Sequence, residues 1–192
     1  MNTPINRSSK NSAAGFTLVE LAVAVLILAI GALGLAGLQI SAKRAGFEAV
    51  QRTQAAALAT DLFERMRVNP SDLTLYQTAG VGAATGSSLS TPAKNCVSST
   101  CVASELATQD MWQWEQAIDG ANATRSGVNT GGLLNAIGCV TVTGRRVTIE
   151  IAWQGAELLS DPNSGSGCGT GLYGTDDADR QILQMTSMIG TI

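Results

Sequence analysis

Residues 15–38 read Gly-Phe-Thr-Leu-Val-Glu-Leu-Ala-Val-Ala-Val-Leu-Ile-Leu-Ala-Ile-Gly-Ala-Leu-Gly-Leu-Ala-Gly-Leu, and the rest of the chain is organised around this stretch. From Leu21 to Leu38 there are 18 consecutive residues without a charged or polar side chain. A helix of this length and composition crosses a bilayer, with some tilt. We therefore predict that residues 16–38 form a membrane-spanning helix.

The residues before the apolar run do not fit a secretory signal peptide. Such a peptide has an apolar region of about 7–15 residues followed by a small-residue cleavage site. Here the run is longer, and the small residue, Gly15, precedes it. Glu20 lies at the edge of the run, where a lone carboxylate is expected to be functional because its insertion costs about 3 kcal/mol at a helix centre. The alternative is that Glu20 simply reaches the membrane interface.

The segment Gly15-Phe16-Thr17-Leu18-Val19-Glu20 resembles the class III signal of type IV pilins. This resemblance implies that a prepilin peptidase cleaves after Gly15, removing residues 1–15, and that the new amino-terminal Phe16 is N-methylated. It also implies that Glu20 is an assembly contact, paired with the methylated amine of a neighbouring subunit. Such a pairing offsets much of the desolvation of both charges.

Charge supports export of everything after Leu38. The leader carries Arg7, Lys10 and no acid, which keeps the amino terminus cytoplasmic by the positive-inside rule. The formal net charge is −3, and removal of the leader gives −3 − 2 = −5. This acidic balance argues against nucleic acid as a partner, because nucleic-acid binding needs a basic footprint.

No combination of residues in the sequence indicates catalysis. The chain has no histidine, the commonest general base. Its serines and glycines lack the spacing of a nucleophile elbow or of a phosphate-binding loop. We therefore expect no enzymatic activity, no catalytic residue and no cofactor.

Four cysteines, Cys96, Cys101, Cys139 and Cys168, lie in the part predicted to be exported. An even number of cysteines outside the cytoplasm indicates disulfides, and four cysteines allow three pairings. We favour Cys96–Cys101 and Cys139–Cys168, because pairs close in sequence form without crossing the predicted sheet. A zinc site is disfavoured by the absence of both histidine and a C-x-x-C pattern.

The helical pattern continues beyond the membrane segment. An apolar stripe recurs every three or four residues: Phe47, Val50, Gln54, Leu58, Leu62 and Met66, with Phe63 beside it. Pro70 predicts the end of the helix, because the residue before a proline disfavours the α conformation. One helix over 16–68 is expected, with residues 39–68 packed under a head that extends to residue 192.

The head is predicted to be α+β. A second helix is expected over 103–118, and strands are expected over 140–142, 147–153 and 182–189, with a turn at 143–146. Segments 70–95 and 120–132 are expected to be loops. The sheet region spans 139–192, and three or more antiparallel strands against the long helix make a pilin-like fold.

Asp176, Asp177 and Asp179 allow two interpretations. Three carboxylates in four residues can bind Ca²⁺ with help from carbonyl oxygens. The alternative is a solvated acidic turn before the last strand. We favour the turn and expect no metal, because the sequence lacks the glycine and the closing glutamate of an EF-hand loop.

A second motif, Arg65-Met66-Arg67-Val68-Asn69-Pro70, resembles the end of the first helix in PilV-type minor pilins of the type IV pilus. The resemblance implies a subunit at or near the pilus tip that primes or modifies assembly, with roles in twitching motility and cell adhesion. Its partners would be the prepilin peptidase, other minor pilins, the major pilin and a tip adhesin. Before assembly it would sit in the inner membrane with a periplasmic head, and afterwards in the extracellular pilus.

Two alternative functions remain open. One is a minor pseudopilin of a type II secretion system. The other is a membrane-anchored adhesive head that never enters a filament and keeps residues 1–15. Cleavage at Gly15 separates the first of these from the second.

Overall fold

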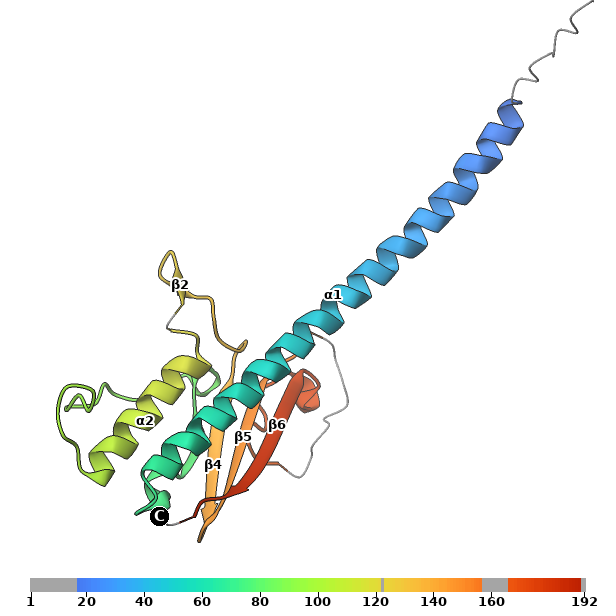
Figure 1. Cartoon of the computed structure of the whole chain (residues 1–192). Coiled ribbons are helices and arrows are strands. Elements are labelled where there is room, and N and C mark those ends of the chain that lie inside the picture. The colour runs from blue at the N-terminus through green and yellow to red at the C-terminus, as the bar shows by residue number, and fades with distance from the viewer. Residues whose placement is uncertain (1–16, 122, 157–165, 191–192) are drawn as a thin grey trace, which may run out of the picture. The chain divides into compact units, whose positions relative to one another are not determined.

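The computed structural model describes residues 17–121, 123–156 and 166–190 (Figure 1). The chain divides into two compact units, residues 1–43 and 44–192, and one helix, α1 (Leu18–Val68), contributes to both. The fold is α+β and pilin-like, as predicted. The remaining elements are η1 (Leu73–Tyr76), β1 (Thr78–Val81), η2 (Ala83–Thr85), α2 (Ala103–Ile118), β2 (Thr124–Arg125), β3 (Val128–Asn129), β4 (Ile137–Thr143), β5 (Arg146–Gln154), η3 (Thr175–Asp177) and β6 (Arg180–Met188).

Both ends of α1 follow from local sequence. At the start, the side-chain oxygen Oγ1 of Thr17 accepts a hydrogen bond from the backbone N–H of Glu20 at 3.3 Å. Threonine is a preferred residue at this position because it satisfies one of the amides that the first helical turn leaves free. At the other end, α1 stops at Val68, directly before Asn69-Pro70, where the sequence predicted its end.

Four antiparallel strands form the main sheet, in the order β1-β4-β5-β6. The β4–β5 hairpin pairs Thr143 with Arg146, so its turn consists of Gly144 and Arg145. Gly144 has a φ of +61°, which glycine adopts without strain. Strands β2 and β3 form a separate two-stranded hairpin.

The core of the second unit lies between α1, α2 and one face of the sheet (Figure 1). From α1, the buried apolar residues are Ala55, Ala59, Leu62, Phe63 and Met66, and the sheet contributes Val140, Val147, Ile149, Ile151 and Trp153. From α2, the buried Trp114 donates its indole N–H to the backbone carbonyl of Leu58 at 3.0 Å. The two helices and the sheet therefore share one core.

The predicted stripe on α1 was wrong at its beginning. Phe47 and Val50 are about half exposed, and the buried positions there are Gln51, Ala55 and Ala59. Alanines let the backbone of the helix approach the sheet closely, so packing places the small residues inward and leaves the larger ones outside. The sequence pattern ranks residues by hydrophobicity and therefore missed this choice.

Two of the predicted loops contain strands. Strand β1 lies within segment 70–95 and pairs with β4, and the β2–β3 hairpin lies within segment 120–132. The Thr-Ala-Gly-Val sequence of β1 gives only a weak strand signal, because its two central residues, Ala79 and Gly80, are disfavoured in strands. The segment is extended because β4 pairs with it. Glycine at position 80 avoids a clash, because a Cβ there would lie 2.5 Å from Cδ1 of Ile137, which is too close.

Two disulfides are present, Cys96–Cys101 and Cys139–Cys168. These are the pairs that the sequence analysis favoured. The first closes a short loop before α2. The second joins β4 to the segment 166–174, which precedes η3 and β6.

Candidate functional site

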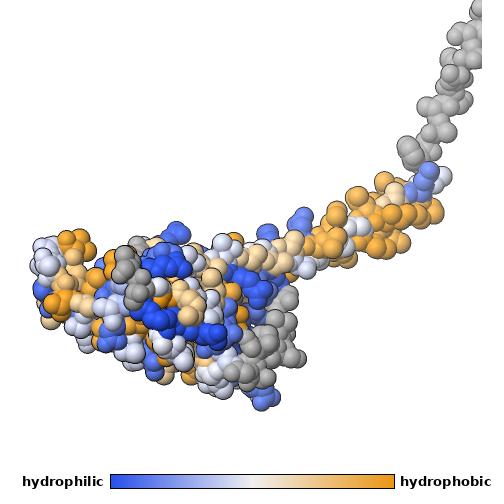
Figure 2. All heavy atoms as spheres, turned by 60° about the horizontal axis from the view of Figure 1, so that its bottom comes forward, coloured by the Kyte–Doolittle hydropathy of each residue, from blue (hydrophilic) through white to orange (hydrophobic). Residues whose placement is uncertain are grey.

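The amino-terminal part of α1 has the properties of a membrane segment. Among the described residues, α1 is the one helix that is long and apolar enough to cross a bilayer. None of its most apolar 18-residue stretch is buried within the chain. Figure 2 shows hydrophobic side chains covering this part of the helix. Exposed leucines and valines over so many turns are unfavourable in water, so this segment requires lipid or other apolar helices around it.

Glu20 lies in the first turn of α1, and its side chain is exposed. The free amides at a helix amino terminus stabilise a carboxylate there. Together with Thr17, Glu20 has the spacing of a capping box, Thr-x-x-Glu. The predicted cleavage and methylation positions, Gly15 and Phe16, lie outside the described residues.

At the other end of α1, Arg65 joins the two helices of the head. Its Nε donates to Asp61 Oδ2 within α1 at 2.8 Å. Its Nη1 donates to two groups on α2, Asp110 Oδ1 at 3.1 Å and Gln113 Oε1 at 2.7 Å. The planar guanidinium holds its donors on separate nitrogens in a fixed geometry, and here Nε and Nη1 together serve all three acceptors.

The carboxylate of Asp110 continues this network into the core. Its Oδ2 accepts a hydrogen bond from the hydroxyl of Tyr76 at 2.8 Å. That hydroxyl in turn accepts one from Nδ2 of Asn69 at 3.1 Å, and the same nitrogen donates to the carbonyl of Ala103 at 2.8 Å. Desolvation by burial, together with the carboxylate, raises the pKa of Tyr76, so this side chain remains a hydrogen-bond donor.

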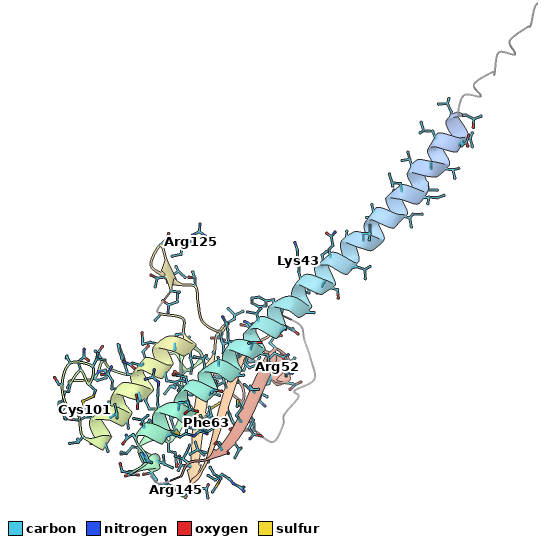
Figure 3. The ribbon with its side chains drawn as sticks, in the orientation of Figure 1. Lys43, Arg52, Phe63, Cys101, Arg125 and Arg145 are labelled. Carbon is cyan, nitrogen blue, oxygen red and sulfur yellow. A yellow bond between two sulfur atoms is a disulfide. The ribbon has the colours of Figure 1, made fainter. Side chains whose placement is uncertain are left out.

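The Arg65–Pro70 motif is therefore the structural joint between α1, η1 and α2. Arg145, in the β4–β5 turn, adds the sheet to this joint: it donates to the carbonyl of Pro70 at 3.0 Å and to the carbonyl of Ile189 at 2.6 Å (Figure 3). Arg67 donates to Ser187 on β6 at 3.3 Å. Sequence reasoning found the motif by resemblance but missed Tyr76, Asp110 and Arg145, for which no local pattern exists.

The acidic triplet 176–179 does not form a cation cage. The carboxylate of Asp177 is buried and accepts hydrogen bonds from the backbone amides of Gly171, at 2.8 and 2.9 Å, and Tyr173, at 3.2 Å. Asp176 is exposed. Within the described parts of the chain, no three acidic, cysteine or histidine side chains come together as metal ligands. Asp177 organises the loop that the Cys139–Cys168 disulfide holds.

A long helix that is apolar and exposed at its start, and anchored in a small antiparallel α+β head at its end, defines a pilin-like subunit. Residues 37–112 match a family model described as type IV pilin Tt1218, and residues 10–36 match the prokaryotic N-terminal methylation motif. Together the two matches support the interpretation of this chain as a pilin or pseudopilin subunit of the type IV pilin superfamily. No curated protein and no solved structure matches the chain.

The two matched ranges include the residues singled out above. The methylation motif covers Gly15, Phe16 and Glu20, and the pilin match covers the joint from Arg65 to Asp110. The motif implies processing by a prepilin peptidase and assembly with other pilins. The type IV pilin family is structural rather than enzymatic.

Proposed function

We propose that this chain is a minor pilin of the type IV pilus, of the PilV type, which is incorporated at or near the tip and primes or modifies assembly. The observation that supports this proposal best is the single helix α1, unbroken from Leu18 to Val68. Its exposed apolar half suits a bundle of like helices, and its buried half is fixed in the head by Arg65 and Asn69.

The proposed assembly begins in the inner membrane, with the head in the periplasm. Prepilin peptidase removes residues 1–15, and Phe16 is methylated at its new amino group. The exposed carboxylate of Glu20 then pairs with the methylated amine of a neighbouring pilin. Glu20 lies only four residues after Phe16. If neighbouring subunits have similar sequences, pairing the Glu20 of one subunit with the Phe16 amine of the next would therefore fix the axial offset between them.

The partners we propose are other minor pilins, the major pilin and a tip adhesin. The motif Arg65–Pro70 supports the PilV type through its resemblance, and the described structure gives that motif a clear role in holding the head together. A minor pseudopilin of a type II secretion system has the same signal and helix, and it is the second candidate.

Intact-mass and amino-terminal analysis of the protein from its native host tests the proposal. We expect a chain that begins at N-methyl-Phe16, present at low stoichiometry in sheared surface fibres. A Gly15→Leu variant serves as the control and is expected to stay uncleaved in the membrane. Uncleaved wild-type protein confined to membranes of piliated cells would instead indicate an anchored head. A processed chain that is absent from pili, together with a loss of protein secretion when its gene is deleted, would indicate the pseudopilin.

A further inference from the structure

The head contains a groove beside α1 that the joint described above does not use. It has a volume of about 500 Å³ and lies between residues 47–54 of α1 and the segment 129–135 that precedes β4. Its polar side chains are Gln51, Gln54, Asp119, Asn129, Thr130 and Asn135. We call it the acceptor groove.

Gln51 is one of the residues that line this groove, and its side chain holds an unsatisfied acceptor. The side chain is 3 % exposed, and its amide oxygen Oε1 is buried without a hydrogen-bond partner. Buried polar side-chain atoms almost always have a partner, so an orphaned one in a residue that lines a groove calls for an explanation. An amide oxygen needs an N–H or O–H donor, and the described residues do not supply one.

Asp119 provides charge in the same groove. Its Oδ1 accepts a hydrogen bond from the backbone N–H of Ala83 at 2.7 Å, which fixes the carboxylate. No lysine or arginine lines the groove, and within the described parts of the chain Asp119 takes part in no ion pair. Burial raises the pKa of this carboxyl group, so a cation beside it would relieve an unfavourable environment.

The walls suit the stem of a long basic side chain. Phe47 and Val50 line the groove and are 49 % and 56 % exposed. Lysine and arginine bury their methylene stems on such apolar surfaces while the charged end reaches a polar group. A free cation would gain nothing from these walls, so the groove fits a side chain rather than an ion.

The chain itself indicates where such side chains come from in an assembly. Lys43, Arg44 and Arg52 are exposed on α1, and none of them forms an ion pair with another described residue. Figure 3 shows Lys43 directed away from the helix axis. All three basic residues belong to the same stretch of α1 as the wall at 47–54, so a parallel, slightly shifted α1 of a similar subunit would present a basic side chain at this level.

We propose that the acceptor groove binds a lysine or arginine side chain from α1 of a neighbouring pilin subunit, with Asp119 and Gln51 as its acceptors. This proposal rests on the proposed function, since it requires that the chain assembles beside other pilins. It adds a specific contact in the head to the apolar packing of the helices.

Site-specific photo-crosslinking in the native host tests the proposal on the full-length chain. A benzoylphenylalanine residue in place of Asn129, which is exposed at the groove, should crosslink to α1 of a pilin subunit, in a peptide that contains lysine or arginine. Asp119→Asn keeps an oxygen for the amide of Ala83 and removes the charge. It should lower the yield of this crosslink about tenfold, the usual worth of one charge-assisted hydrogen bond.

Two further variants complete the test. Gln51→Leu removes the orphaned acceptor without leaving a new one and should also lower the yield. Asp176→Asn is the matched control, because it removes an exposed carboxylate elsewhere and asparagine tolerates the φ of +56° at that position. It should leave the yield unchanged, and thermal melting checks that all variants fold.

The outcomes separate this inference from the proposed function. Wild-type protein that is processed and present in fibres, with equal crosslink yields for wild type and Asp119→Asn, overturns the groove proposal and leaves the pilin function standing. A crosslink to a protein other than a pilin also overturns it. Wild-type protein that never enters fibres overturns the proposed function itself, and the groove proposal with it.

Discussion

Replacement of Tyr76 by phenylalanine is expected to lower the free energy of unfolding of the head by about 2 kcal/mol. Tyr76 is fully buried, and its hydroxyl donates to the carboxylate of Asp110, which is 6 % exposed. The variant leaves this buried carboxylate with one donor fewer and removes one of the two acceptors of Asn69 Nδ2, which keeps the carbonyl of Ala103. A hydrogen bond to a charged group contributes about 1.5–3 kcal/mol, and Asp110 keeps its contact with Arg65, so we expect a loss near the middle of that range.

Thermal unfolding of the full-length protein in detergent, followed by tryptophan fluorescence with the disulfides intact, measures this loss. For a domain of about 150 residues, each kcal/mol corresponds to about 2–4 °C, so the melting temperature should fall by about 4–8 °C.

Tyr173 provides the matched control. It is also buried, but its hydroxyl lies 2.9 and 3.1 Å from two neutral acceptors, the carbonyls of Asn135 and Ala152. A bond to a neutral carbonyl contributes about 1 kcal/mol, so Tyr173→Phe should cost about half as much as Tyr76→Phe. Equal losses, or a larger loss at Tyr173, would refute the view that the buried charge at Asp110 makes the α1–α2 joint the more demanding site.

Three further predictions concern charge and covalent links. Glu20→Ala should leave cleavage and methylation at Phe16 intact, as seen by mass spectrometry, but exclude the chain from fibres; normal incorporation would argue against the pairing. Burial raises the pKa of Asp119 in the folded state, so its favourable contribution is complete at low pH and is lost as the pH rises through that pKa. Asp119→Asn should therefore raise the melting temperature at pH 7, and the difference should vanish at about pH 3; a lower melting temperature at pH 7 would contradict this. Replacing Cys139 and Cys168 by alanine opens a loop with a sequence separation of 29 and should cost about 3.5 kcal/mol in chemical denaturation, so a loss below about 1 kcal/mol would show that the loop is held by its hydrogen bonds alone.

Local sequence predicted the long helix, its end, the second helix and the central hairpin. These elements have strong short-range signals: an unbroken apolar run, an Asn-Pro stop and alternation along β4 and β5. Strand β1 had no such signal, because its extended shape depends on hydrogen bonds to β4, far away in the sequence. The β2–β3 hairpin pairs locally, but each of its strands has only two residues, which is too short to show an alternating pattern.

The residues of the candidate site also fall into two groups, those that the sequence indicated and those that only the structure showed. The sequence indicated Glu20 and the cleavage position, because a membrane segment tolerates so few polar residues that each one stands out. It also indicated the Arg65–Pro70 motif. It did not indicate Asp110 or Tyr76, since polar residues in a head of this composition are common and only packing shows which ones are buried together.

The sequence by itself determined that this chain has one apolar helix with a pilin-type signal and an α+β head, because hydrophobic runs, prolines and strand alternation act over a few residues. Only the tertiary structure decided which face of α1 is buried, that Asp177 binds backbone amides, and that Gln51 and Asp119 line the same groove. Those outcomes depend on which distant segments exclude water from one another, and a buried polar group acquires its partner only when that packing is complete.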